Sequence, residues 1–205
     1  MEYPAESMAD FPVDTVKRSI VQAALKLGED AGNWDAVHVH DVAREAGITL
    51  EELRRYFGDK DAIAEGYFDI ADAALLAVSK KPGWMELPIR ERLYTAVTTW
   101  LDALAPHRGL AVGMLGYKLH PEHLHLQVRG IARISRTVQW IREAAMLPSV
   151  GWRREVEEAA LTTIYLTTFS CWLGDKTPGA ERTRRLLKGL LAGAEYGALR
   201  LARRA

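Results

Sequence analysis

The chain has 205 residues, of which 48% are hydrophobic and 26% are charged, as is ordinary for a soluble globular protein. No apolar run approaches the roughly 20 residues that a membrane-spanning helix needs, and the acidic first residues contain no hydrophobic signal core. The single cysteine, Cys171, excludes an internal disulfide framework and favours a reducing compartment. We therefore expect a cytoplasmic protein.

The net charge is zero, but the charges are distributed unevenly along the chain. Residues 1–80 contain eight basic and sixteen acidic residues, and the remainder has the opposite excess. A nucleic-acid-binding segment is normally basic, so this asymmetry counts against DNA binding by the N-terminal part. Between Thr15 and Ala62, however, the acidic excess is only two, and phosphate contacts depend on where a few cations point.

Apolar residues recur at helical spacing along almost the whole chain, which predicts an all-α fold. We expect a disordered leader over residues 1–13, a three-helix helix-turn-helix domain over 14–60, and a C-terminal helical bundle over 61–205. Asp59 is the expected N-cap of the fourth helix. The predicted helices span residues 14–31, 39–46, 50–56, 60–80, 88–105, 108–119, 121–147, 152–174 and 179–203.

Residues 41–63, DVAREAGITLEELRRYFGDKDAI, have the pattern of a helical hairpin. Gly47 supplies the backbone freedom that a sharp turn between two helices requires. Thr49 and Glu52 fit a capping box at the start of the second helix. Glu51 lies four residues before Arg55, so these two side chains can pair along the helix. Base readout by Glu51 stays open, because a glutamate can accept a hydrogen bond from the N4 amino group of cytosine.

The run TVKRSIVQAALKL…VHVHDVAREAGITLEELRRYFGDKDAI resembles the N-terminal domain of the tetracycline-repressor (TetR) family of transcriptional regulators. The resemblance covers about 50 residues. It implies an all-α homodimeric repressor that binds a double-stranded DNA operator and releases it when a small apolar effector enters the C-terminal domain. No enzymatic activity and no cofactor are implied.

Several positions of the hairpin match the family's DNA-contacting positions. Thr49, Tyr56 and Lys60 match the residues that contact the DNA backbone, and Arg54 replaces a phosphate-contacting tyrosine. His38 stands where the family usually has threonine, and His40 where it has a basic residue. The resulting DNA-binding prediction comprises His38, His40, Thr49, Leu50, Glu51, Arg54, Arg55, Tyr56 and Lys60.

Aromatic residues occur at intervals along the C-terminal helices, which are otherwise rich in Leu, Ala and Thr. These rings can form a simple core, or they can line a ligand cavity between the helices of the bundle. The resemblance favours the second interpretation. The predicted ligand-binding residues are Trp100, Tyr117, Trp140, Tyr165, Phe169 and Trp172.

Two charged motifs in the same half have competing interpretations. The stripe Arg129, Arg133 and Arg136 is either a solvated helix face or a site for an anionic head group. The motif LHPEHLH, residues 119–125, contains possible metal ligands. However, on a helix that begins at Pro121, His123 and His125 would diverge by about 200°, so we expect no metal site.

The last predicted helix carries leucines on one side and Gly189, Gly193 and Gly197 at intervals of four residues. Such a helix suits either a two-fold interface in a homodimer or close packing inside one chain.

The alternative to a DNA-binding regulator is a lipid-binding accessory protein that has a TetR-like fold, similar to the ubiquinone-biosynthesis lipid-binding proteins, and no longer binds DNA. The acidic N-terminal half and the arginine stripe favour this alternative.

Overall fold

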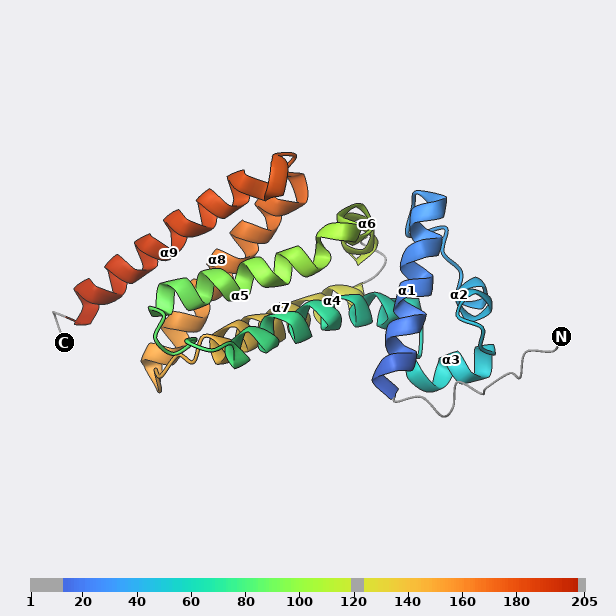
Figure 1. Ribbon diagram of the computed structural model, residues 1–205, viewed down its shortest axis with the longest axis horizontal. Coiled ribbons are helices and arrows are strands. Elements are labelled where there is room, and N and C mark those ends of the chain that lie inside the picture. The colour runs from blue at the N-terminus through green and yellow to red at the C-terminus, as the bar shows by residue number, and fades with distance from the viewer. Residues whose placement is uncertain (1–12, 119–123, 203–205) are drawn as a thin grey trace. The chain divides into compact units, whose positions relative to one another are not determined.

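The computed structural model describes the backbone of residues 13–118 and 124–202, with the side chains of 15–115, 130 and 132–200 (Figure 1). Every regular element in this part of the chain is helical, which confirms the predicted all-α fold. The predicted leader lies outside the described residues except for its last position. The chain divides into two compact units, and each is described by itself.

The first unit contains the predicted helix-turn-helix. Its core includes Val16 and Ile20 on the apolar stripe of α1, Leu53 of α3 and Ile63 of α4, all of which are buried. Gly66 allows close packing, since a Cβ there would lie 2.9 Å from the side chains of both Phe57 and Val21. The helices of this unit are α1 (Val13–Ala31), α2 (Val39–Glu45), α3 (Leu50–Tyr56), the first part of α4 (Lys60–Ala77) and α6 (Arg108–Lys118).

The position of α6 differs from the organisation expected from the sequence. This helix contacts α1, and the side chain of Leu110 packs against the backbone at Gly28. Nδ1 of His107 also lies 2.6 Å from Oε1 of Glu29. The first compact unit therefore includes α6 and residues up to 70, while the functional boundary at residue 60 remains a prediction.

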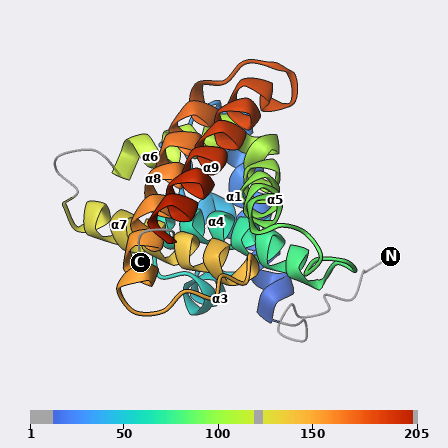
Figure 2. The same cartoon turned by 90° about the vertical axis from the view of Figure 1, so that its left-hand side faces the viewer.

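The second unit is a helical bundle. In it α8 and α9 run side by side in opposite directions (Figures 1 and 2), and α5 contacts α7, α8 and α9. Short 3-10 turns lie at Val78–Lys80, Ala105–His107 and Pro178–Ala180. The helices of this unit are the end of α4, α5 (Ile89–Leu104), α7 (Leu124–Ala144), α8 (Trp152–Gly174) and α9 (Glu181–Ala202).

The end of α7 comes three residues earlier than the sequence pattern predicts. Met146 adopts a positive φ of 52°, and the amide of Leu147 donates to the carbonyl of Arg142, which closes the helix with a left-handed cap. Pro148 follows and lacks the N–H that a continuing helix needs. The expected start of this helix at Pro121 lies outside the described residues.

A buried polar cluster lies in the core of the second unit. The carboxylate of Asp72 on α4 accepts hydrogen bonds from the indole of Trp100 (2.8 Å), Nη2 of Arg133 (2.8 Å) and the hydroxyl of Thr137 (3.1 Å). The prediction of a solvated arginine stripe is thus wrong for Arg133, which is buried, although Arg136 is exposed. The side chain of Arg129 lies outside the described set. Asp72 was not among the predicted functional residues, and the one sign of its role in the sequence is an acidic residue within the apolar pattern of α4.

Candidate nucleic-acid interface

The turn between α2 and α3 is fixed by its backbone. Gly47 has φ +69°, a left-handed conformation that is strained for other L-residues. Its amide donates to the carbonyl of Arg44, and the amide of Ile48 donates to the carbonyl of Ala43 at 3.0 Å. This paired capping pattern ends α2 and sets the angle at which α3 departs.

The predicted capping box at the start of α3 is confirmed. The amide of Glu52 donates to Oγ1 of Thr49 at 3.1 Å, and the amide of Thr49 donates to Oε2 of Glu52 at 2.8 Å. The hydroxyl of Thr49 also donates to Oε2 of Glu52 at 2.9 Å, and this bond and the one from the Thr49 amide favour the charged carboxylate and lower the pKa of Glu52 below its ordinary value. Glu52 thus stabilises the first turn of α3 and also suits the positive end of the helix dipole.

On the outward face of α3 the side chains form two columns. The two residues of each column lie one helical turn apart. In one column the guanidinium of Arg55 pairs with the carboxylate of Glu51 at 2.9 Å, as predicted from their spacing. In the other column Leu50 is 52% exposed and Arg54 is exposed. Among the described residues, Arg54 makes no hydrogen bond or ion pair, so its charge is available to a partner.

Other cations of the hairpin are held by neighbouring side chains. Arg44 pairs with Asp41 at 2.5 Å, and Lys26 of α1 pairs with Glu45. These pairs lie on exposed surface and offset much of the positive charge outside α3. Within the hairpin, the attraction for a polyanion therefore depends mainly on Arg54, since Arg55 is paired with Glu51.

The side chain of Lys60, which was predicted to contact the DNA backbone, also contacts residues of its own chain. Its ammonium group donates to the backbone carbonyl of Asp35 at 3.0 Å and lies 5.4 Å from the ring centre of Trp34. Burial lowers the pKa of Lys60 below its ordinary value. The lysine thus joins α4 to the loop between α1 and α2.

The remaining predicted DNA contacts lie around the same hairpin. His38 and His40 stack with ring centres 5.4 Å apart at the start of α2, and both are exposed. Thr49 is exposed at the start of α3, whereas Tyr56 at its end is half-buried. Contact of these nine residues with DNA remains a prediction.

Four of the predicted ligand-binding aromatics form one cluster in the second unit. The ring of Trp100 meets those of Tyr165 and Phe169 edge-on at 5.4 and 5.3 Å, and Phe169 stacks on Trp172 at 5.9 Å. Trp140 is 39% exposed, and the side chain of Tyr117 lies outside the described residues. These rings contact one another closely. A ligand site at these residues stays a prediction.

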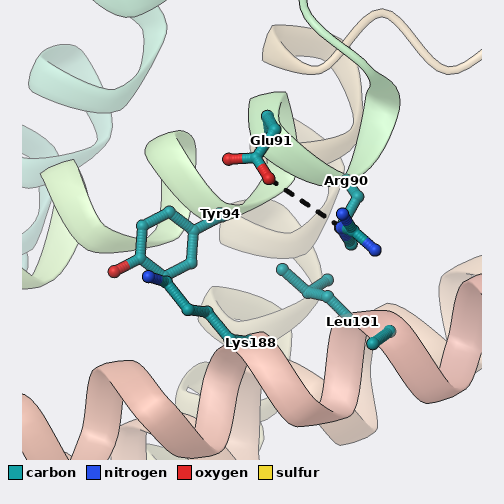
Figure 3. Close-up of a pocket in the computed structure, with 6 residues that line it drawn as sticks. Arg90, Glu91, Tyr94, Lys188 and Leu191 are labelled. Carbon is teal, nitrogen blue, oxygen red and sulfur yellow. Dashed lines mark ion pairs between the residues drawn. The ribbon is translucent and has the colours of Figure 1, made fainter.

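A partly open cavity of about 350 Å³ lies elsewhere, between α5 and α9 (Figure 3). In it Lys188 lies beside the ring of Tyr94, 5.2 Å from the ring centre, and Arg90 pairs with Glu91 at 3.9 Å (Figure 3). Arg90 also pairs with Glu195 at 2.9 Å. The charges of this groove are thus largely engaged with one another. Its lining consists of Arg90, Glu91, Tyr94, Lys188, Leu191 and Ala192.

The described residues contain no cluster of His, Cys, Asp or Glu that could bind a metal ion. Residues 119–123 of the LHPEHLH motif lie outside the described backbone, as does the side chain of His125. In the parts of the chain that are described, no helix combines the length and apolar character that a membrane span requires.

A capped helix-turn-helix hairpin in one compact unit and a helical bundle in another define a helical DNA-binding regulator. Solved structures of such regulators match the chain. A TetR transcriptional regulator from Nitrosomonas europaea ATCC 19718 shares 37% sequence identity over 88% of this chain and 98% of its own, with a TM-score of 0.77. At this identity and coverage, the chain belongs to the TetR family of transcriptional regulators.

Two more distant structures have the same fold. A TetR transcriptional regulator from Rhodococcus sp. RHA1 is 19% identical over 86% of this chain and 96% of its own, with a TM-score of 0.62. A TetR-family regulator from Streptomyces coelicolor is 18% identical over 95% of this chain and 89% of its own, with a TM-score of 0.60. No protein-family model matches the sequence, and no curated protein matches it. Regulators of this family are DNA-binding proteins rather than enzymes, as the sequence predicted.

Proposed function

We propose that this protein is a cytoplasmic homodimeric repressor that binds a double-stranded DNA operator through α3 of each copy. The observation that carries the proposal is the outward face of α3. There Arg54 has no acidic partner among the described residues, and the capping box and the Gly47 turn hold the helix in a fixed orientation. A recognition helix held in this way can enter the major groove with its N-terminal residues toward the bases.

The last turns of α9 support a homodimer. From Ala192 to Arg200 every side chain is exposed, including Tyr196 at 58% and Leu199 at 57%. A Cβ added at Gly189, Gly193 or Gly197 would meet no atom within 4 Å. The open space at these glycines favours a second copy of the chain as the occupant of this surface over close packing inside one chain.

A small apolar effector would bind in the bundle next to the cluster of Trp100, Tyr165 and Phe169. Binding there would favour one arrangement of the bundle and shift the population of the protein away from the DNA-binding state. Since these rings contact one another, a ligand would have to displace at least one of them. Quenched tryptophan fluorescence and a raised melting temperature in the presence of ligand would support such a site.

The lipid-binding alternative loses one of its supports. The arginine stripe suggested a site for an anionic head group, but Arg133 is buried and pairs with Asp72. The acidic character of the N-terminal half is also partly explained, because Asp41, Glu45 and Glu52 have structural partners.

A mobility-shift assay with DNA from upstream of the protein's own gene tests the proposal. We expect a retarded complex that survives excess unrelated DNA, and sedimentation should give a dimer at micromolar concentration. If a folded dimer shifts no DNA in this assay even at low salt, DNA binding is contradicted and the lipid-binding alternative is favoured.

A further inference from the structure

Glu51 is the acidic side chain that α3 presents outward. Its side chain is 81% exposed, whereas Glu52 is half-buried and engaged with Thr49. Glu51 is the second residue of α3, and the N-terminal residues of a recognition helix are the ones that reach base edges. A carboxylate at this position is therefore accessible to the bases of DNA that α3 reads.

Arg55 offsets the negative charge of Glu51. Its guanidinium lies 2.9 Å from Oε1 of Glu51 and is itself 68% exposed. The pair carries no net charge, so Glu51 does not add a negative charge to the negative groove. The same contact favours an orientation of the carboxylate along the helix, which reduces the entropy lost when it binds a base.

Base chemistry in the major groove then limits what Glu51 can read. A carboxylate only accepts hydrogen bonds, and it is repelled by N7 and O6 of guanine and by O4 of thymine. Adenine offers the N6 amino group, but its N7 acceptor lies beside that donor. Cytosine offers the N4 amino group with no acceptor of its own at the groove edge, so it suits a carboxylate best.

We propose that Glu51 selects a cytosine in each half-site of the operator by accepting a hydrogen bond from its N4 amino group, and that Arg55 positions the carboxylate. This inference rests on the proposed binding of DNA through α3. It assigns to Glu51 a role in specificity, while Arg54 supplies attraction that does not depend on sequence.

The test is selection from a random double-stranded DNA library by the full-length protein and by two matched variants. In Glu51→Gln the side chain becomes an amide that pairs with N6 and N7 of adenine, so the selected cytosine should change to adenine while the other positions stay the same. In Glu52→Gln, which alters the neighbouring carboxylate of the capping box, the selected sequence should be that of the wild type.

Direct affinities complete the test. Replacing the selected C·G pair by T·A should weaken wild-type binding by about tenfold or more, within the range of one good base contact, and should weaken Glu51→Gln much less. An unchanged cytosine in the Glu51→Gln selection, or the same change with Glu52→Gln, would overturn the inference and leave the proposed function standing. If the folded wild-type dimer binds none of the library, both fail.

Discussion

Nη2 of Arg133 donates a 2.8 Å hydrogen bond to Oδ2 of Asp72, and both side chains are more than nine-tenths buried. Removing one member of a buried ion pair leaves the other without charge compensation, which costs about 3–5 kcal/mol. We therefore expect Asp72→Leu and Arg133→Met each to lower the free energy of unfolding by that amount in denaturant titrations.

The double variant is the control for this pair. Asp72→Leu combined with Arg133→Met removes both charges of the pair, so it should be more stable than either single variant. Independent, additive losses in the double variant would show that the pair is not a coupled unit.

The capping box makes a prediction that separates stability from DNA affinity. Thr49→Ala should lower the free energy of unfolding by about 1 kcal/mol, the usual effect of losing an N-cap. Glu52→Ala should also destabilise the protein, whereas Glu51→Ala removes only an exposed pair and should change stability little. Thermal unfolding of the three variants checks this, and equal stability of Glu52→Ala and the wild type would contradict it.

The open glycine stripe of α9 predicts the effect of a bulky side chain on dimerisation. Gly193→Leu should weaken association, because leucine would block the close approach of a second copy, while the single chain has space for it. Gly109→Leu on α6 is the matched control, since a Cβ there also meets no atom within 4 Å. Sedimentation at several concentrations should show a weaker dimer only for Gly193→Leu. If both variants behave like the wild type, this surface is not the interface.

Asp175 between α8 and α9 predicts a pH-dependent contribution to stability. Its carboxylate accepts hydrogen bonds from the amide and hydroxyl of Thr177 and from those of Thr183, and these bonds hold its pKa well below the ordinary value. The stabilisation is therefore complete above about pH 4, the region of the unfolded-state pKa, and is lost as the pH falls toward the lower folded-state pKa.

Denaturant titrations of Asp175→Asn at pH 7, 4 and 3 test the sign of this effect. The variant should be less stable than the wild type at pH 7, and the difference should shrink below about pH 4. Asp30→Asn, at an exposed position of α1, is the control for the same substitution away from this cluster. A difference that grows as the pH falls would contradict the assignment.

Local patterns predicted the hairpin well, because its structure depends on contacts between near neighbours in the sequence. The capping box, the Gly47 turn and the Glu51–Arg55 pair each involve residues within five positions of one another. The contact of α6 with α1 and the burial of Arg133 depend on residues 61–82 positions apart, and no local periodicity reports those. Composition likewise does not predict a helix end that lacks glycine, such as the one at Met146.

The proposed binding of DNA by α3 depends on the charge of its outward face. Fluorescence anisotropy with labelled upstream DNA, at several salt concentrations, measures this for the wild type and for Arg54→Ala. We expect similar stability for the two proteins, weaker binding by Arg54→Ala to all sequences, and a salt dependence reduced by about one unit in the logarithmic slope. Equal affinities and slopes for Arg54→Ala and the wild type would contradict it.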